Sequence, residues 1–596
     1  MKKNIYIGYM MLAVGMLSVT SCTDYSDYND VPQDRLSSAN QTLWENIAKN
    51  SNLTDFKSLL EKSGFNAELN NSHTYTVWAP EDGSFNVADY DKLSQEELLN
   101  QFVKNHVAEY NYAASGELNK RIHTLNEKSY VFEGNGTYSF DGLEVLKSNI
   151  PGNNGVLHTI KGAAKFYPNL YEYIQKGERV DSILRAYFLK YETTRLDENK
   201  SVKGPVDENG YQTYIDSVTV TTNSLTNRLN ARIAKEDSSY TMLIPTEKAY
   251  TDMYEKVKKL NRYIGTTQAQ TDFSSATSFT TKSTTIDADY MTDSLSSFAV
   301  VENLIFNNHL SYNRWLEGKS EDKDTLVTTL DESLSNPQEI LSYQKGDKVM
   351  LSNGQAFVMD TLAFRPWETY NPMIIVNPAG NVRPDNPKQL FNFNFSSTAK
   401  KQTLPDSLIA PVLGNLDFLD KETVDQISSF NYMWYEPNGD YGKPDIFVTL
   451  PNVLSGTYKF YVVFMPSAME ELGKDTLPNL LNFQLNYCTE KNTIAKYNFT
   501  SSGKENPTVH SKTTAFTNDP TKTDVICIGK FKFPVAYKGL GGEYRPNLRI
   551  YSPINPYPTK PGQPAADLLL YTRNVRIAFI VLVPEEYDNY KSQNNN

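Results

Sequence analysis

Residues that could bind a metal or act as catalytic bases are few in this sequence, and they are not spaced for either task. There are six histidines, namely His73, His106, His123, His158, His309 and His510. No two of them form an HxxxH or HExxH pattern, and no Cys-x-x-Cys occurs, so no zinc site is predicted. A GxSxG elbow and a Walker loop are also absent from the sequence. We therefore expect a non-catalytic protein without metal or cofactor.

Acidic residues leave one enzymatic alternative open. The cluster Glu321-Asp322-Lys323-Asp324 lacks the glycine and the bidentate glutamate of an EF-hand loop, which argues against calcium. Two carboxylates that cleave a glycosidic bond meet only in the folded protein and leave no spacing rule in the sequence. A polysaccharide-acting enzyme therefore remains an alternative.

Length and charge limit the class of protein. A chain of 596 residues is too long for one hydrophobic core and predicts several domains. The formal net charge of -12 argues against nucleic acid as a partner, because phosphate binding requires a basic surface. Beyond the N-terminal segment, no apolar run is long enough to span a bilayer.

The N-terminus predicts export and lipid attachment. Lys2 and Lys3 precede an apolar run at 5–19, which is typical of a cleaved secretory signal. The next residues, Val19-Thr20-Ser21-Cys22, resemble the lipobox of bacterial lipoproteins, which implies acylation of Cys22 and anchoring in the outer membrane. An incidental cysteine in an ordinary signal peptide is the alternative.

An acidic segment follows Cys22. Asp24, Asp27 and Asp30 resemble the signal that sends some bacterial lipoproteins to the exterior face of the outer membrane; a flexible acidic tether would look the same. The two remaining cysteines, Cys488 and Cys527, lie in strand-like runs. They could form a disulfide or remain two free thiols.

Three motifs occur twice in the same order. The run from Tyr75 to Phe85, YTVWAPEDGSF, is echoed by YTMLIPTEKAY at 240–250. Asn105-His106 is matched by Asn308-His309, and Asn154-Gly155 by Asn353-Gly354. The order predicts a duplicated module. The second copy carries an insertion that includes the Ser/Thr-rich stretch 265–285, for which we expect a surface loop or a disordered segment.

These motifs resemble the fasciclin (FAS1) domain. The resemblance implies two tandem α+β modules, at 38–175 and, more divergently, at 178–376. Apolar stripes at 43–65 support helices in the first module, with Asn52 or Thr54 as the cap of the second helix. The family's general role is adhesion or scaffolding. It implies a contact role for Asn105, His106, Asn308 and His309, whereas structural histidines are the alternative.

The C-terminal third, 377–596, has a different pattern. Seven short runs rich in Phe, Tyr, Val and Ile alternate with turns and predict an all-β antiparallel sandwich. The pattern resembles jelly-roll modules that bind carbohydrate. In NYMWYEP, Tyr432 and Trp434 share a face if the segment is a strand, so Tyr432, Trp434 and Tyr435 are candidate glycan contacts. Core packing of these rings is the alternative.

Together these features predict five segments: a signal peptide at 1–21, an acidic tether at 22–37, two fasciclin-like modules and the sandwich. We expect a surface lipoprotein that binds a glycan, a peptide or a protein. Its layout resembles accessory components of TonB-dependent nutrient importers, which would then be partners. An adhesin that binds host matrix or other cells through its fasciclin modules is the main alternative.

Overall fold

The computed structural model describes residues 40–272, 280–307, 325–381, 391–393, 397–403, 406–417, 419, 431–466, 476–503, 511–541 and 545–594. The chain divides into two compact units. Unit 1 comprises residues 1–177, 232–240 and 348–356, and unit 2 comprises the remainder. Each unit is described by itself below.

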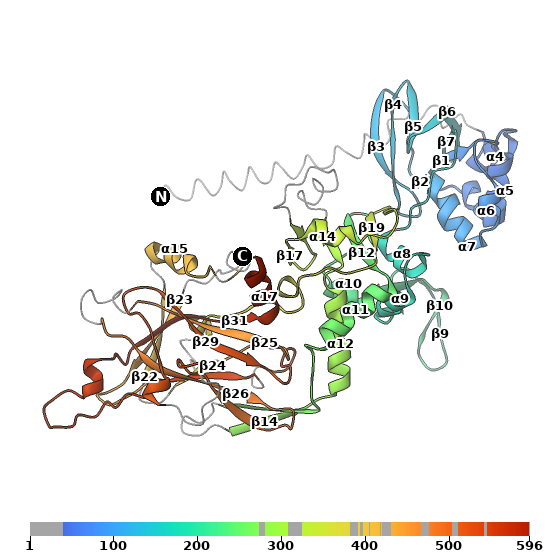
Figure 1. Ribbon diagram of the computed structural model, residues 1–596. Coiled ribbons are helices and arrows are strands. Elements are labelled where there is room, and N and C mark those ends of the chain that lie inside the picture. The colour runs from blue at the N-terminus through green and yellow to red at the C-terminus, as the bar shows by residue number, and fades with distance from the viewer. Residues whose placement is uncertain are drawn as a thin grey trace, which may run out of the picture. The chain divides into compact units, whose positions relative to one another are not determined.

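Unit 1 combines short helices with one seven-stranded sheet (Figure 1). Its helices are α4 (Leu43–Lys49), α5 (Thr54–Ser63), α6 (Ala88–Asp91), α7 (Gln95–Leu98) and α8 (Leu170–Lys176), with a π-helical turn η3 (Leu99–Val103) and the 3-10 turns η2 (Glu68–Asn70) and η4 (Lys104–His106). Its strands are β1 (Tyr75–Pro80), β2 (Val107–Glu109), β3 (Glu117–His123), β4 (Ser129–Asn135), β5 (Thr137–Phe140), β6 (Leu143–Gly152) and β7 (Gly155–Ile160), in the order β2-β1-β7-β6-β5-β4-β3.

The helices of unit 1 form where apolar spacing and local caps agree. A capping box between Thr42 and Glu45 starts α4, and Gly64 ends α5 in the left-handed conformation. The predicted stripe is buried completely, at Leu43, Ile47, Leu53, Phe56, Leu59 and Leu60. Neither Asn52 nor Thr54 caps α5, which corrects that prediction. The carboxylate of Asp82 accepts the backbone N–H groups of the first turn instead.

Strand β1 separates two hydrophobic cores because its side chains alternate between the faces of the sheet. Val77 and Ala79 pack with the helices, whereas Trp78 faces the core formed by β3, β4 and β5. The Trp78 ring stacks on Phe140 with centroids 4.3 Å apart. Strands β1 and β7 run parallel, while the other pairs in this sheet are antiparallel.

The second repeat folds into helices and small sheets. The helices are α9 (Ser182–Leu189), α10 (Ser224–Arg228), α11 (Glu247–Lys258), α12 (Ala288–Val301) and α14 (Pro337–Ser342). The strands are β8 (Glu192–Leu196), β9 (Val202–Val206), β10 (Gln212–Asp216), β11 (Thr219–Asn223), β12 (Tyr240–Pro245), β15 (Ile305–Asn307), β16 (Leu326–Val327), β17 (Ser333–Leu334), β18 (Val349–Leu351) and β19 (Gly354–Met359). Four of these strands form a sheet in the order β15-β12-β19-β18, which parallels the order β2-β1-β7-β6 of unit 1.

The insertion at 265–285 contains regular structure. Strands β13 (Thr266–Asp272) and β14 (Thr280–Thr285) pair antiparallel, with Thr266 opposite Thr285. The prediction of a loop or a disordered segment is therefore wrong for these two stretches, and residues 273–279 lie outside the described part. Threonine favours strands, a preference that the low apolar content of the stretch concealed.

The C-terminal region of unit 2 contains two six-stranded antiparallel sheets. The first, named here the β31 sheet, has the order β22-β23-β31-β25-β29, and β20 also pairs with β31. The second, the β26 sheet, has the order β21-β24-β30-β26-β27, and β28 also pairs with β26. The strand bounds are β20 (Ile374–Val376), β21 (Phe391–Phe393), β22 (Ser397–Thr403), β23 (Asn431–Pro437), β24 (Asp445–Thr449), β25 (Thr457–Phe464), β26 (Leu480–Cys488), β27 (Ile494–Asn498), β28 (Phe516–Thr517), β29 (Asp524–Lys532), β30 (Asn547–Tyr551) and β31 (Val575–Pro584).

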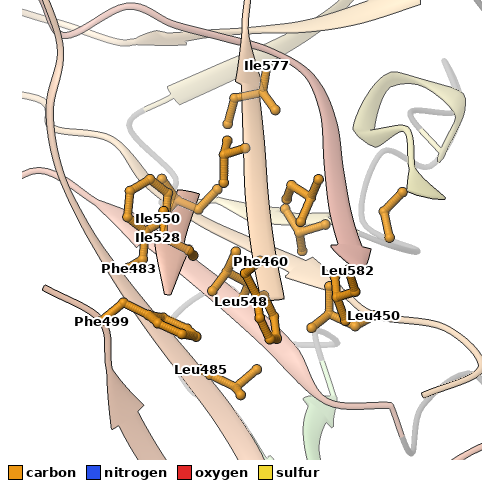
Figure 2. Packing of buried hydrophobic residues seen from close by; sticks show 14 of the residues in the cluster. Leu450, Phe460, Phe483, Leu485, Phe499, Ile528, Leu548, Ile550, Ile577 and Leu582 are labelled. Carbon is orange, nitrogen blue, oxygen red and sulfur yellow. The ribbon is translucent and has the colours of Figure 1, made fainter. Parts of the chain in front are cut away.

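One hydrophobic core draws on both of these sheets. Phe460 and Ile577 come from the β31 sheet, and Phe483, Leu548 and Ile550 from the β26 sheet (Figure 2). Along β26 and β30 the apolar residues alternate with polar ones, so only one face of the β26 sheet joins this core.

Helices cover the opposite face of the β31 sheet. Val412 of α15 (Asp406–Gly414) and Tyr587 of α17 (Glu585–Asn594) join a second apolar cluster with Val463 and Phe579. Both faces of the β31 sheet are therefore buried at β31, which fits the burial of every residue of that strand and its almost entirely apolar sequence. None of the helices within the described residues has the length and hydropathy that a bilayer crossing requires.

Candidate functional site

Asn105 and His106 are completely buried. The His106 ring bonds the Phe102 carbonyl through Nδ1 at 2.7 Å and accepts the Ala164 N–H at Nε2, 2.8 Å away. Asn105 donates to the Ala164 carbonyl and accepts the hydroxyl of Tyr130. Because these polar groups are engaged inside unit 1, the contact role predicted for Asn105 and His106 is corrected to a structural one.

Three other predicted residues lie outside the described part of the chain. They are Cys22, Asn308 and His309. Cys488 is a free buried thiol, and Cys527 is a free exposed one, so the two do not form a disulfide.

The three aromatic residues of β23 do not form one exposed surface. Tyr432 and Trp434 do share a face, as their spacing predicts, but Tyr432 packs in the cluster beneath α15 and α17. Tyr435 points into the core between the two sheets. Trp434 is half-buried, with the Arg576 guanidinium 4.9 Å from its ring centre. The predicted glycan contact is therefore wrong for Tyr432 and Tyr435, which are buried, whereas for the half-buried Trp434 it stays a prediction.

In the first repeat, Asn154 of the Asn-Gly motif joins the start of β7 to the start of α4 by hydrogen bonds. Asn154 Oδ1 accepts the N–H of Leu43, the first residue of α4, at 2.8 Å. Its amide nitrogen donates to the carbonyls of Leu69 and Asn71, at 2.9 and 2.7 Å. A buried amide with three bonds is well satisfied, so this residue holds the fold together rather than meeting a ligand.

Asn353 makes the same set of hydrogen bonds in the second repeat. Asn353 Oδ1 accepts the N–H of Leu170, the first residue of α8, at 2.8 Å. Its amide nitrogen donates to the carbonyls of Ile233 and Lys235, at 2.7 and 3.0 Å. Equivalent residues thus make equivalent bonds in both repeats, which accounts for the recurrence of this dipeptide in the sequence.

A buried ion cluster in unit 1 was not predicted. Lys128 Nζ lies 2.7 Å from Glu172 Oε2 and 2.8 Å from Glu236 Oε1, and the lysine side chain is only 2% exposed. Ser352 Oγ lies 3.4 Å from the same nitrogen, and the Phe166 ring centre 5.3 Å from it. The charge is thereby neutralised where it is buried, as a stable buried charge requires.

Beside this cluster, unit 1 has a groove of about 820 Å³. Named here the acidic groove, it is lined by Glu96, Glu97, Asn100, Gln101, Asn126, Glu127, Phe166, Glu172, Gln175 and Lys176, among others. Most of the polar residues in this lining are glutamates, asparagines and glutamines, and the lining contains one lysine, Lys176. The hydroxyl and N–H of Ser94 lower the pKa of Glu97 by bonding its carboxylate. The groove can therefore accept hydrogen-bond donors and positive charge.

Sequence reasoning missed the acidic groove because its walls come from three separated stretches. They are the α7 region, the turn at 124–128 and the segment 166–177. Only the acidic start of α7, Glu96-Glu97, was visible locally, and it reads equally well as a helix N-terminus. In the described residues, no group of three or more His, Cys, Asp or Glu side chains could hold a metal ion.

The geometry defines unit 1 as a mixed α+β module of short helices and a seven-stranded sheet. Residues 51–163 match the family model for the Fasciclin domain. No curated protein matches the chain.

Solved structures resemble parts of the chain. The FAS1 domain pair of the insect cell adhesion molecule fasciclin I shares 12% identity, covers 54% of this chain and 99% of its own, and has a TM-score of 0.19. Paenibacillus xanthan lyase shares 11% identity over 39% of this chain and 15% of its own, with a TM-score of 0.17. The Podospora anserina GH26-CBM35 β-(1,4)-mannanase shares 8% identity over 36% and 27%, with a TM-score of 0.16. TM-scores this low carry no argument about function.

Proposed function

We propose that this protein is a non-catalytic binding protein displayed outside the cell, in which the fasciclin unit contacts a partner macromolecule. The observation that carries the proposal is the fasciclin domain at 51–163, because fasciclin domains serve cell adhesion. The acidic groove, which lies against that domain's α7, supplies a suitable contact surface. Its amides and carboxylates favour a protein or peptide partner with lysine or arginine side chains.

The groove is tested by reversing its charge in the mature full-length chain. Glu96→Lys combined with Glu127→Lys replaces two exposed groove carboxylates, while Glu61→Lys, at an exposed position of α5, is the control. Surface plasmon resonance would measure binding to a panel of matrix proteins and to a lysine-rich peptide. We expect the double variant to lose binding, the control to keep it, and salt to weaken it. Unchanged binding by the double variant would contradict the groove as the contact.

We also infer that the second repeat is a divergent fasciclin-like module. The shared strand order and the matching bonds of Asn154 and Asn353 support this inference. For the C-terminal region we infer a jelly-roll sandwich. The supporting feature is that the chain passes between the two sheets at most steps from β23 to β31, which yields the orders β23-β31-β25-β29 and β24-β30-β26-β27.

Membrane attachment through an acylated Cys22 completes the proposal. The support is the lipobox-like sequence before Cys22 and the acidic segment after it. Labelling cells with a palmitate analogue should mark the wild-type chain and not Cys22→Ala, and protease added to intact cells should degrade only an outward-facing protein. Co-purification of a TonB-dependent importer would support the accessory role in nutrient uptake.

Adhesion to host matrix or other cells is the second candidate function, and the fasciclin domain itself favours it. Beads coated with the mature chain should then attach to matrix proteins, and deletion of 377–596 should leave that attachment intact. If the protein is instead an accessory component of a nutrient importer, the importer should co-purify with it and the coated beads should not attach to matrix proteins.

A further inference from the structure

Two exposed tyrosines from separate loops of unit 2 stack on each other. Tyr441 lies between β23 and β24, and Tyr557 lies between β30 and β31. Their ring centroids are 4.8 Å apart and their planes differ by 14°. The two residues remain 49% and 60% exposed, respectively. This tyrosine pair therefore presents flat aromatic surface to solvent.

The loop that carries Tyr441 is tied to the sheet behind it. Arg573 Nη1 donates to the carbonyls of Gly439 and Gly442, at 2.7 and 3.1 Å. The Tyr435 hydroxyl, reaching out of the core, donates to the Lys443 carbonyl at 3.3 Å. The exposure of Tyr441 is thus held in place by bonds on both sides of the residue.

The loop that carries Tyr557 is stiff for a different reason. Pro556 and Pro558 flank the tyrosine, and a following proline restricts Tyr557 to extended backbone. The Tyr557 N–H donates to Asn555 Oδ1 at 3.2 Å, and the Asn555 N–H donates to Asp567 Oδ2 at 2.5 Å. Little conformational entropy remains to be lost when a ligand binds such a preorganised surface.

We propose that the tyrosine pair is a stacking platform for a pyranose ring of a glycan. The apolar C–H face of a sugar matches an aromatic face, while its hydroxyls can reach polar groups at the rim, where Asp440 and Asn555 are exposed. Nucleobases also stack on aromatic rings, but the net charge of -12 opposes their phosphates. This site extends the proposed binding role to a glycan and does not depend on the acidic groove.

The test is affinity electrophoresis of the mature full-length chain through gels that contain soluble polysaccharides of plant, fungal and host origin. Tyr441→Ala and Tyr557→Ala each remove one ring, and Tyr441→Phe keeps the ring. Tyr211→Ala, at a tyrosine that is 72% exposed, is the matched control. At least one polysaccharide should retard the wild type, the phenylalanine variant and the control, and each alanine variant should bind it about tenfold more weakly.

Several results would overturn the proposal. The first is that no polysaccharide retards the wild type. The second is that the alanine variants are retarded as much as the wild type. The third is that no glycan binds, whereas lipid vesicles bind the wild type and not the alanine variants. The last result would assign the pair to a lipid surface. Far-ultraviolet circular dichroism of each variant shows that lost binding is not lost folding. Because the groove variant should bind the same polysaccharide normally, failure of one site does not imply failure of the other.

Discussion

Lys128 and Glu236 form an ion pair of 2.8 Å although 108 residues separate them in the chain. The lysine precedes β4 in the first repeat, and the glutamate belongs to the segment 232–240 that joins unit 1. Their side chains are 2% and 7% exposed, and Glu236 Oε2 has no hydrogen-bond partner within the described structure. A short stretch of the second repeat is therefore held in unit 1 by charge as well as by backbone bonds.

Removing one member of this pair should be costly. Lys128→Met leaves the Glu236 carboxylate buried without a cation, so we expect the free energy of unfolding to fall by about 3–5 kcal/mol. Urea denaturation followed by circular dichroism measures the change. Lys248→Met breaks the ion pair with Asp252, in which both side chains are exposed, so it should change the free energy of unfolding very little. Equal effects of the two variants would contradict the role of burial.

Gly155 and Gly354 should resist substitution for the same reason in both repeats. Their φ angles are +146° and +143°, and a Cβ at either position would overlap the carbonyl oxygen of Tyr75 or Tyr240, respectively. We expect Gly155→Ala and Gly354→Ala to lower the thermal midpoint strongly. Gly83 also has a positive φ, of +74°, but nothing within 4 Å of the site of a Cβ, so Gly83→Ala should cost only about 1 kcal/mol. If all three variants lose the same stability, the close approach of the tyrosine carbonyl oxygen is not what requires glycine at positions 155 and 354.

Features that local sequence determines were predictable. The apolar stripe of 43–65, the strand before Pro80 and the recurring Asn-Gly each depend on neighbours in the chain, and the structure confirms them. The cap of α5 was not predictable, because Asp82 reaches it from 27 residues away. A histidine at a helix end reads the same whether it is buried or exposed, so the burial of His106 required the fold.

The candidate ligand surfaces were hidden for a related reason. Tyr432 and Trp434 share a face as predicted, yet only the fold shows that α15 and α17 cover it. Tyr441 and Tyr557 lie in loops far apart in sequence, and no spacing rule brings their rings together. Binding residues often lie on loops, where side chains follow no regular spacing. Periodicity in the sequence therefore indicates a hydrophobic core more readily than a binding site.

The two remaining cysteines should differ in reactivity. Cys488 is buried and Cys527 is exposed, but partial desolvation by neighbouring groups raises the pKa of the Cys527 thiol as burial raises that of Cys488, so little thiolate forms at neutral pH. Iodoacetamide should modify Cys527 slowly in the native protein and Cys488 only after denaturation, as peptide mass mapping would show. A disulfide-linked peptide containing both residues in a non-reduced digest would contradict the free thiols.

Two buried histidines should make unit 1 sensitive to mild acid. Burial lowers the pKa of His106 and of His158 from 6.5 to about 4, since desolvation penalises the imidazolium. Between these two pKa values the unfolded chain binds more protons than the folded chain. The free energy of unfolding should therefore fall as the pH drops from 6.5 to 4, by on the order of 1.4 kcal/mol per pH unit for each histidine.

Replacing one of these histidines should flatten that dependence. His158→Gln can still bond the Tyr112 carbonyl, which His158 Nε2 contacts at 2.9 Å, but cannot take up a proton. The variant should be less stable than the wild type at pH 7, and its deficit should shrink as the pH falls toward 4. Parallel pH profiles for His158→Gln and the wild type would mean that His158 does not contribute to the acid sensitivity.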